Sequence, residues 1–382
     1  MTNKVLILAS VASMIDQFNI SNIHILKEMG YEVHIACNFK VGNTCNDERI
    51  LLLKNRLMNM KVDYYQIDFM RSITKISDNL KAYKQVLDLV NKHDYKFIHC
   101  HSPIGGVIGR IIGRLTNTKI IYTAHGFHFY KGAPLLNWVI YYPIELWLSR
   151  FTDILITINK EDFRLASDKF KAKKIVYVPG VGIDTIKFRS LSINISEKRE
   201  LLGVPKNSFI LLSVGELNKN KNHEVIIRSL KILNNPKIHY LICGQGNLKE
   251  YLIKISNKLG LQDHVHFLGF RDDISEICKA SDIFLFPSLR EGLGLAALEA
   301  MASGLPLITS NVHGIMDYSI NGVTGLIANP KDVKEFSYAI NKLLNDQRLR
   351  DKIGINNIKT AEMFDSKIIN IKMFEIYKEE FN

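Results

Sequence analysis

The chain has 382 residues, of which 47% are hydrophobic and 23% are charged. Because a single hydrophobic core seldom grows past about 250–300 residues, this length favours two domains. The formal net charge of +12 excludes an acidic protein, yet the basic residues are scattered and no nucleic-acid-binding module is recognisable, so we expect no nucleic-acid partner.

The N-terminus and the cysteines bear on the cellular compartment. No run reaches the roughly 18 uninterrupted apolar residues that a membrane-spanning helix needs. The first residues, Met1-Thr2-Asn3-Lys4, lead straight into an apolar run without the long apolar region and cleavage site of a signal peptide. The five cysteines are odd in number and widely spaced, which indicates reduced thiols. We therefore expect a cytoplasmic protein without disulfides or a zinc site.

Short apolar runs alternate with longer amphipathic stretches, which is the pattern of parallel sheets covered by helices. In the first half, the predicted strands cover residues 5–8, 32–35, 97–99, 120–122, 154–157 and 175–178. A second series covers residues 210–214, 239–242, 265–267, 283–286 and 307–309. Because the series restarts, the sequence predicts an α/β fold of two Rossmann-like parallel-sheet domains.

The boundary between the domains is expected where turn residues replace the periodic pattern. Pro179-Gly180-Val181-Gly182 and the polar stretch 190–207 indicate a hinge. We predict an N-terminal domain over residues 1–185 and a C-terminal domain over 186–358. A final helix, about 359–382, can pack back on the first domain. The two sheets would face each other across a cleft, with ligands outside the carboxyl ends of the strands.

The most informative segment, residues 286–306, runs from a buried strand through a glycine-bearing turn into a helix. The first N–H groups of a helix have no partner within it and favour anions. The backbone of Gly292, Leu293, Gly294 and Leu295 is therefore suited to a diphosphate.

Two glutamates flank this helix start. Glu299 lies within the first two turns, where its carboxylate can accept hydrogen bonds from a ribose, and Glu291 lies just before the helix and can reach a sugar. Each glutamate alone could equally be a surface acid that the helix dipole stabilises. The ordered combination of strand, glycines, acids and a terminating Gly-Leu-Pro favours a binding site.

A second segment, residues 211–223, opens the second domain with a strand and a polar turn that contains Lys221. A nucleoside diphosphate that leaves in a reaction needs a cation to stabilise it. Most lysines in loops are only solvated. The case for Lys221 therefore comes from its position after the strand.

A third segment, residues 120–132, places His125 directly after a strand of the first domain. A histidine can donate a hydrogen bond to a sugar hydroxyl or a phosphate, or share a proton. His99, His101 and His128 compete for the same role. His125 is favoured because it follows its strand most closely.

Together these segments resemble family 4 of the retaining glycosyltransferases, which has the GT-B architecture, and most closely its bacterial capsular and exopolysaccharide branch. The resemblance covers nearly the whole chain. It rests on the Glu-x7-Glu pair Glu291 and Glu299, on Tyr-Thr-Ala-His-Gly-Phe-His-Phe at 122–129, on Val-Pro-Gly-Val-Gly-Ile-Asp at 178–184 and on Ser-Val-Gly-Glu-Leu-Asn at 213–218. The glutamate pair is specific to the clan, and segments 122–129 and 213–218 are specific to the branch.

The resemblance implies roles for individual side chains. Glu299 would bind the ribose of a nucleotide-sugar donor and Glu291 the donor sugar. Lys221 would meet the diphosphate, and His125 would touch the sugar from the N-terminal, acceptor-side domain.

It also implies roles for the backbone of the C-terminal, nucleotide-sugar-binding domain. The backbone at Phe270 and Arg271 would hold the base, and residues 292–295 would hold the distal phosphate.

Two departures from the family pattern stand out. Many members have an arginine where this chain has Glu216, so either Lys219 substitutes for that cation or Lys221 works alone. Many also have two glycines after the first strand, whereas the loop at residues 9–16 has none. The acceptor side therefore stays open, and the missing Gly-x-Gly-x-x-Gly counts against a dinucleotide enzyme.

The function implied by the resemblance is retaining transfer of a sugar from a nucleoside diphosphate, with UDP favoured, to a hydroxyl of a growing glycan on a polyprenyl diphosphate carrier. The expected activity is that of a hexosyl- or N-acetylhexosaminyltransferase. The sequence has no Asp-x-Asp triplet in a suitable loop and no visible metal cluster. We therefore expect neither a metal nor a cofactor, with fixed positive groups in place of Mg²⁺.

An aromatic-rich segment, residues 134–148, contains both tryptophans. In a basic first domain it could contact an anionic membrane at the inner face of the cell. The alternative, which we favour for most of these side chains, is a buried helix pair broken near Pro143.

Two rival functions remain open at this stage. A nucleotide-sugar epimerase could share the double-Rossmann plan and would turn over the donor without an acceptor. A non-catalytic nucleotide-sugar-binding module is supported by Glu216 and would bind the donor without releasing nucleotide.

Overall fold

The computed structural model describes residues 3–43, 45–70 and 76–381. Two compact units make up the chain. Unit 1 comprises Met1–Val181 and Ile369–Asn382, and unit 2 comprises Gly182–Ile368. The first division therefore follows Val181, where the sequence placed it after residue 185, and the last helix enters unit 1 at Ile369.

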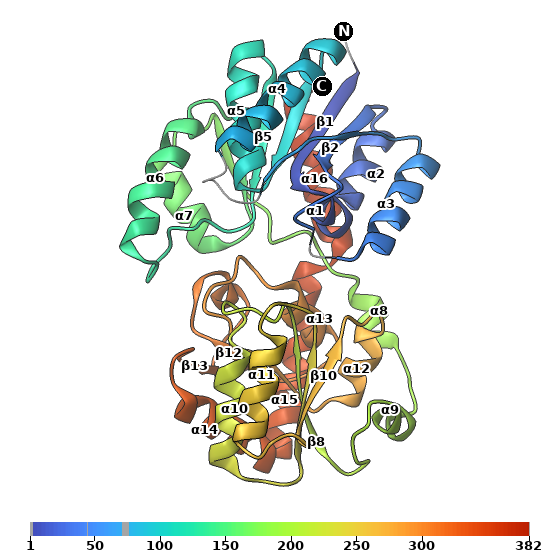
Figure 1. The fold of residues 1–382 in the computed structure, drawn as a ribbon, viewed down its shortest axis with the longest axis vertical. Helices are drawn as coiled ribbons and strands as arrows, with labels where there is room; N and C mark the ends of the chain where they lie inside the picture. The colour runs from blue at the N-terminus through green and yellow to red at the C-terminus, as the bar shows by residue number, and fades with distance from the viewer. Residues whose placement is uncertain (1–2, 44, 71–75, 382) are drawn as a thin grey trace. The chain divides into compact units, whose positions relative to one another are not determined.

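Unit 1 is built on a seven-stranded sheet with the order β3-β2-β1-β4-β5-β6-β7, and each neighbouring pair is parallel (Figure 1). Its strands are β1 (Lys4–Val11), β2 (Glu32–Asn38), β3 (Asp63–Gln66), β4 (Phe97–His101), β5 (Lys119–Ala124), β6 (Ile154–Thr157) and β7 (Lys174–Tyr177). All six strands predicted from the sequence are confirmed. The edge strand β3 was missed because its four residues, Asp-Tyr-Tyr-Gln, form no apolar run.

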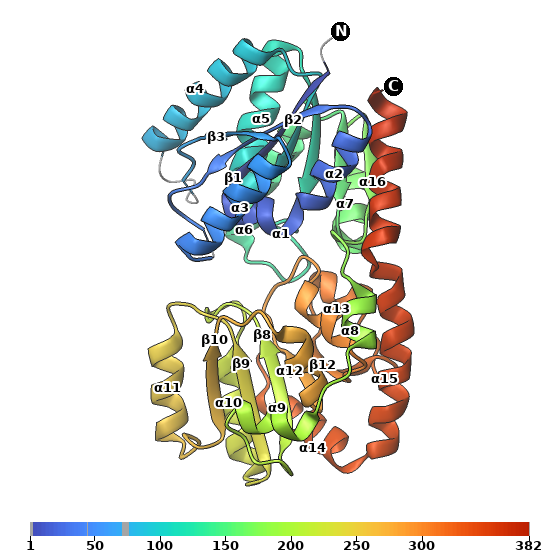
Figure 2. The ribbon, with the colours of Figure 1, turned by 90° about the vertical axis from the view of Figure 1, so that its right-hand side faces the viewer.

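Helices cover both faces of this sheet (Figure 2). They are α1 (Ala12–Phe18), α2 (Ile20–Glu28), α3 (Asp47–Asn59), α4 (Ile76–His93), α5 (Pro103–Thr116), α6 (Leu135–Ser149), α7 (Lys160–Lys169) and α16 (Ser366–Phe381), the last of which belongs to unit 1 from Ile369. Asn46 and Asn159 cap α3 and α7 by accepting hydrogen bonds from backbone N–H groups of the first turn.

The prediction of a helix pair broken near Pro143 is wrong, because α6 runs unbroken from Leu135 to Ser149. A proline inside a helix removes one backbone hydrogen bond, but it need not end the helix when packing holds the next turn. Glu145, in that next turn, is buried and pairs with the buried Arg110 of α5 at 2.7 Å. This ion pair holds α6 against α5 beyond the proline.

Unit 2 has a six-stranded parallel sheet with the order β10-β9-β8-β11-β12-β13. Its strands are β8 (Phe209–Val214), β9 (Ile238–Cys243), β10 (Val265–Gly269), β11 (Ile283–Phe286), β12 (Leu307–Ser310) and β13 (Gly325–Ala328). The five predicted strands are confirmed. The sequence missed β13, a four-residue edge strand that begins with glycine.

The helices of unit 2 include two short ones in the stretch where the sequence showed no strong period. The set is α8 (Thr185–Ser190), α9 (Ile195–Leu201), α10 (His223–Leu233), α11 (Lys249–Lys258), α12 (Ile274–Ala280), α13 (Leu295–Ala302), α14 (Val333–Asn345) and α15 (Gln347–Ala361), with 3-10 turns η1 (His313–Asp317) and η2 (Glu362–Phe364). The predicted final helix is interrupted at η2 and resumes as α16.

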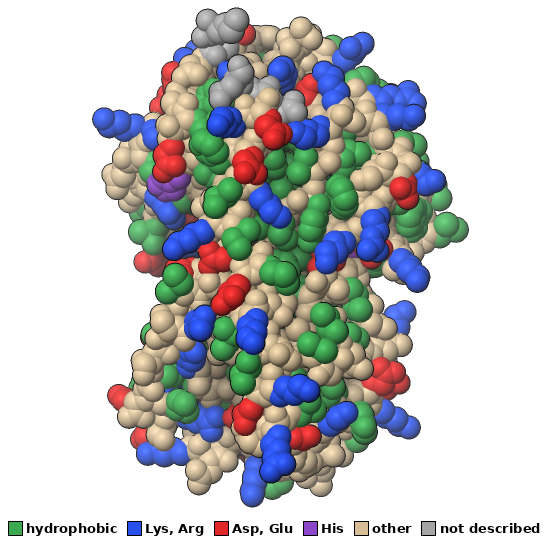
Figure 3. Space-filling view, turned by 180° about the vertical axis from the view of Figure 1, so that it is seen from behind, with side chains coloured by type: hydrophobic (Ala, Val, Ile, Leu, Met, Phe, Trp, Pro, Cys, Tyr) green, Lys and Arg blue, Asp and Glu red, His purple; other side chains and the backbone are tan. Residues whose placement is uncertain are grey.

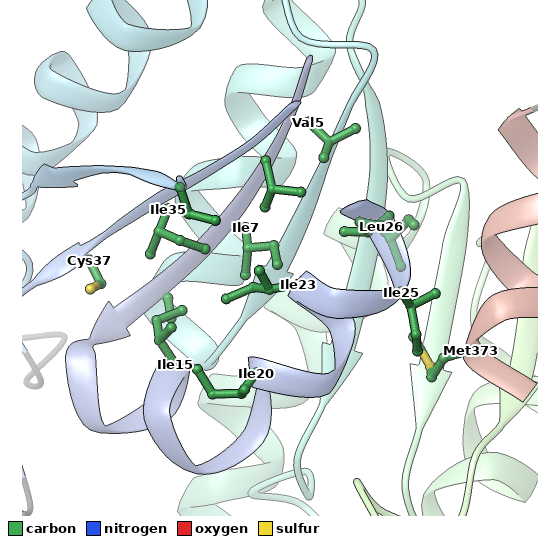
Figure 4. Packing of buried hydrophobic residues seen from close by; sticks show 14 of the residues in the cluster. Val5, Ile7, Ile15, Ile20, Ile23, Ile25, Leu26, Ile35, Cys37 and Met373 are labelled. Atoms are coloured by element: carbon green, nitrogen blue, oxygen red, sulfur yellow. The ribbon is translucent and has the colours of Figure 1, made fainter. Parts of the chain in front are cut away.

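The core of unit 1 shows how the last helix joins the first domain. Figure 4 shows Ile7 of β1 and Ile35 of β2 facing Ile23 of α2, while Met373 of α16 lies beside Ile25. Burying an Ile or Met side chain contributes about 1.5–3 kcal/mol. The C-terminal helix is therefore an integral part of the unit 1 core.

The distribution of charged side chains and the state of the cysteines agree with what the sequence indicated. On the face seen in Figure 3, Lys and Arg side chains are spread among acidic and hydrophobic ones. The five cysteines are free, as predicted, and all except Cys45 are buried. Within the described residues, no helix is both long enough and apolar enough to cross a membrane.

Glycines let α5 lie close to the sheet. A Cβ on Gly109 would overlap the Cys100 sulfur of β4 and lie 3.2 Å from Leu8, whereas a Cβ on Gly105 would lie 3.1 Å from its nearest neighbour, the Ser102 hydroxyl oxygen. The glycine at 109 is thus required by packing.

We predict that Gly109→Ala lowers the free energy of unfolding by about 1–3 kcal/mol, the usual cost of overpacking a core. Gly105→Ala is the matched control in the same helix and should lose clearly less. Thermal or urea unfolding of both variants checks this, and equal losses would contradict the packing argument.

Candidate functional site

The turn between β11 and α13 is the centre of the candidate site in unit 2. It passes from Phe286 to Gly294, whose backbone adopts φ +91°, a conformation that favours glycine. A Cβ at Gly294 would lie 2.5 Å from the Phe286 ring and 3.1 Å from Cγ of Glu291. The glycine therefore lets the turn fold tightly and brings the Glu291 side chain to the start of α13.

Two neighbouring loops hold this turn in place. The Leu289 N–H donates to the Asn220 carbonyl at 2.8 Å, and the Asn220 amide donates back to the Arg290 carbonyl at 2.9 Å. On the other side, the Gly314 N–H donates to the Glu291 carbonyl at 3.1 Å. The turn is thus fixed by hydrogen bonds to the loops that follow β8 and β12.

Lys221 reaches this turn from the loop after β8. Its Nζ lies 2.5 Å from Oε2 of Glu291 and 4.8 Å from the centre of the Phe286 ring. Its backbone N–H donates to the Asn218 side chain at 3.0 Å. Both charged side chains are mostly buried, at 20% and 18% exposure. The structure therefore brings together Lys221 and Glu291, which are 70 residues apart in the sequence.

Other polar side chains near this ion pair were missed by the sequence analysis. The hydroxyl of the buried Ser288 lies 3.5 Å from Oε2 of Glu291. Burial, with the Glu291 charge as a further cause, raises the pKa of the Tyr318 phenol. Ser288 follows β11 by two residues, and this position at the carboxyl end of a strand could have indicated it. Nothing local in the sequence marks Tyr318.

Glu299 occupies the fifth position of α13 and is partly buried. Burial raises the pKa of its carboxyl group to about 7, although the Lys187 charge acts in the opposite direction. Among the residues that the structure describes, its carboxylate has no hydrogen-bond or ion-pair partner. Glu299 thus presents two acceptor oxygens that an added ligand could use.

The loop after β10 holds Phe270 and Arg271. The Phe270 side chain is 52% exposed, and the Arg271 guanidinium binds Asp273 at 2.6 and 2.8 Å. Hydrogen bonding to Arg271 lowers the pKa of Asp273, which also pairs with Lys198 at 2.5 Å. Because its side chain is occupied, Arg271 offers mainly its backbone.

Glu216, which stands where many family members have an arginine, and Lys219, its possible substitute, take no part in the ion pair of Lys221. Glu216 and Lys219 are both exposed, and within the described chain neither side chain forms a hydrogen bond or an ion pair. The structure thus places Lys221, and not Lys219, next to Glu291.

His125, the candidate of unit 1, follows β5 and is partly buried. Its Nε2 lies 3.0 Å from Nδ1 of His101, and burial lowers its pKa to about 4. His99 hydrogen-bonds Tyr377 and Thr123, and His128 stacks on Tyr141. The sequence treated these histidines as competitors, whereas the structure links His101 to His125.

One grouping in the described part of the chain has the composition of a metal site. Glu32, His34 and Asp63 bring their ligand atoms within 4.8 Å of one another in unit 1. Glu32 also pairs with Lys4 at 3.3 Å, so the acid already has a cationic partner. This grouping belongs to the opposite unit from Lys221 and Glu291.

Two Rossmann-like parallel sheets, the second with a cation and two acids around a helix start, are the arrangement that the resemblance to GT-B glycosyltransferases predicts. Residues 194–360 match the family model described as glycosyl transferases group 1. Residues 4–159 match the model described as glycosyl transferase 4-like.

Named relatives match between about four fifths and nearly all of the chain. It is 34% identical to a putative glycosyltransferase EpsD of Bacillus subtilis, over 99% of this chain and 97% of the relative. It is 31% identical to a UDP-Gal:alpha-D-GlcNAc-diphosphoundecaprenol alpha-1,3-galactosyltransferase of Escherichia coli, over 79% of this chain and 82% of the relative. The chain belongs to the group 1, or family 4-like, glycosyltransferases.

Solved structures share the fold. Anabaena HepE in complex with UDP and glucose superposes with a TM-score of 0.80 at 20% sequence identity, covering 98% of this chain and 99% of that one. The likeness confirms the predicted GT-B class of two Rossmann-like domains.

The raised pKa of Glu299 predicts a pH-dependent stability difference. The pKa of this carboxyl is about 7 in the folded state, against an ordinary value of 4.5. The group therefore favours folding below pH 4.5, and this contribution is lost as the pH rises through 7. Glu299→Gln, which cannot ionise, should therefore gain melting temperature relative to wild type between pH 5 and pH 8. A difference in melting temperature that stays constant over this range would contradict the burial of the charge.

Proposed function

We propose that this protein transfers a sugar, with retention of anomeric configuration, from a UDP-sugar to a hydroxyl of a polyprenyl-diphosphate-linked glycan during capsule or exopolysaccharide synthesis. The observation that carries the proposal is the contact of Lys221 with Glu291 at the start of α13. It is supported by the E. coli relative, whose name specifies a UDP-sugar and a diphosphoundecaprenol-linked acceptor, and by HepE, which binds UDP and glucose.

The donor would lie along the turn between β11 and α13, with its sugar at Glu291 and its base at the loop after β10. Glu291 accepts hydrogen bonds from sugar hydroxyls, and Glu299 accepts them from the ribose. Lys221 and the N–H groups of residues 292–295 bind the diphosphate, and the backbone at Phe270 and Arg271 binds the base. Lys221 and Glu291 are paired with each other, and the Glu299 carboxylate has no partner among the described residues.

In the transfer step, the bond between the anomeric carbon and the diphosphate oxygen breaks, and a bond to the acceptor oxygen forms on the same face. The departing phosphate oxygen takes the proton of the acceptor hydroxyl, and UDP leaves. Negative charge grows on the diphosphate during this step, so a fixed cation and oriented N–H groups lower the barrier. Lys221 is the cation, and it exchanges part of its contact with Glu291 for the phosphate oxygens.

We propose that no metal takes part, because Lys221 and the helix N-terminus supply the positive charge that Mg²⁺ gives in other transferases. Acceptor-dependent UDP release should persist in excess EDTA. Full loss of activity, restored by added Mg²⁺, would contradict this part of the proposal.

The experiment that tests the function is a UDP-release assay of the purified protein with a panel of UDP-hexoses and UDP-N-acetylhexosamines. It is run with and without a lipid fraction from a polysaccharide-producing bacterium. Release that depends on the acceptor and occurs with one sugar is expected. Turnover of the donor without acceptor would favour an epimerase, and binding without release would favour a non-catalytic module.

Substitutions in the site should separate donor binding from transfer. Glu299→Ala is expected to weaken donor binding, whereas Glu291→Ala mainly lowers kcat. Lys221→Ala should lower kcat/KM, and the fall should correspond to a loss of about 2–4 kcal/mol of transition-state stabilisation. Lys219→Ala is the control, since its side chain is exposed, and should be close to wild type. A loss at Lys219 in place of Lys221 would reassign the phosphate cation.

A membrane contact through α6 is a second part of the proposal. The helix exposes an apolar stripe whose members are at least 36% exposed: Leu135, Leu136, Val139, Ile140, Ile144 and Trp147. Unit 1 has 26 Lys and Arg against 18 Asp and Glu, which leaves +8. An apolar helix face on a basic unit fits an anionic lipid surface, where a polyprenyl-linked acceptor resides.

We predict that the protein sediments with vesicles that contain phosphatidylglycerol, and less with zwitterionic vesicles. Leu136→Gln with Val139→Gln should reduce binding to anionic vesicles several-fold without changing the melting temperature. The matched control is Leu51→Gln with Leu52→Gln on α3, where both leucines are 59% exposed. Equal losses in both double variants would remove the special role of α6.

A further inference from the structure

Three histidine rings of unit 1 lie next to one another. His99 and His101 alternate along β4, so both side chains point to the same face of the sheet, and their ring centres are 4.1 Å apart. Both rings are buried, and Nδ1 of His101 faces Nε2 of His125 at 3.0 Å. The arrangement connects the partly buried His125 to the interior of the sheet.

Only one proton can lie between His101 and His125. Burial lowers the pKa of His125 to about 4 and that of His101 well below its usual range, with the neighbouring histidines as further causes for His101. Both rings are therefore neutral at pH 7, and each has one N–H. Either His101 donates from Nδ1, or His125 donates from Nε2.

The second nitrogen of His101 distinguishes these two states. Its Nε2 is buried and has no hydrogen-bond partner among the described residues. The residue His101 lines a cavity of about 20 Å³, together with Thr123, Asn22, Asn370 and Gly180. A cavity of about 10–15 Å³ suffices for one water molecule. One water therefore fits beside His101.

The proton is expected on the other nitrogen, Nδ1. A buried N–H group that lacks an acceptor is rarer in proteins than a buried acceptor that lacks a donor. If His125 donated to His101, the N–H of His101 would lie on Nε2 and depend wholly on the single water. If His101 donates from Nδ1, only a lone pair on Nε2 is left without a partner in the part of the chain that the structure describes.

The other histidine and the C-terminal helix fix the ring of His101. Nδ1 of His99 bonds the Tyr377 hydroxyl of α16 at 2.8 Å, and its Nε2 bonds the Thr123 hydroxyl at 2.8 Å. Tyr377 is fully buried, and burial raises its pKa, so its hydroxyl stays protonated. The clamped His99 ring packs against His101 and limits its rotation.

We propose that His101 is a positioning residue that donates from Nδ1 to Nε2 of His125 and thereby holds His125 in the tautomer with its proton on Nδ1. His125 then offers a neutral N–H to a ligand. Resting on the proposed function, that ligand is a hydroxyl or phosphate oxygen of a substrate of the transfer. His125 would act as a hydrogen-bond donor and not as a base.

The test is a long-range ¹H–¹⁵N NMR spectrum of the histidine side chains in the full-length protein at pH 7, assigned with His125→Gln. The expected result is a His125 ring with protonated Nδ1 and unprotonated Nε2. A His125 ring protonated on Nε2, or on both nitrogens, would overturn the proposal. Because this measurement needs no sugar donor, its outcome is separate from the failure or success of the proposed transferase activity.

Variants of His101 give a second readout. His101→Phe keeps a ring but has no donor, so His125 should move toward the Nε2–H tautomer. Its kcat should fall about 10- to 100-fold, by analogy with the loss when groups that orient metal-ligating histidines are removed, with a smaller change in donor KM. In His101→Asn, the side-chain amide can replace Nδ1–H and should restore the tautomer and most of the rate.

His34→Asn is the matched control for loss of a buried histidine. His34 lies on β2 and bonds Tyr95 at 2.7 Å, and it is likewise 1% exposed. The His34→Asn variant should have a lower melting temperature and an unchanged His125 tautomer. Equal rate losses in His101→Phe and His101→Asn, with an unchanged His125 tautomer in both, would show a purely structural role and overturn the proposal.

Discussion

The ion pair between Lys221 and Glu291 is the interaction on which the candidate donor site depends. It joins the loop after β8 to the turn before α13, at a distance of 2.5 Å, and the backbone bonds around Asn220 tie the same two segments together. Within the pair the two charges neutralise each other. A diphosphate and a sugar would each supply a new partner for one member, so the pair keeps both charges ready without leaving either unpaired.

The parallel sheet explains why these loops meet. β8 and β11 are neighbours in unit 2, and the carboxyl ends of parallel strands lie at one edge of the sheet. The same rule places His101 at the carboxyl end of β4 and His125 directly after β5, and these strands are neighbours in unit 1. In both units, residues far apart in sequence become contacts because of strand order.

The sequence predicted much of the fold because most strands are buried apolar runs. It missed β3, which has no apolar run, and β13, which has only four residues and begins with glycine. It also misjudged Pro143, whose helix is held by the buried Glu145. It indicated Lys221 and Glu291 separately, but their contact depends on strand order, which no local pattern fixes. The alternation of His99 and His101 on β4 was a usable signal, whereas their link to Tyr377 depends on the return of α16.

The most direct test of the central claim is a double-mutant cycle on Lys221→Ala and Glu291→Ala, measured as kcat/KM for acceptor-dependent UDP release. If the two side chains act as one unit, the double variant should lose at least about 1 kcal/mol less than the sum of the single losses. Losses that add within about 0.5 kcal/mol would contradict the account, because independent sites behave in that way.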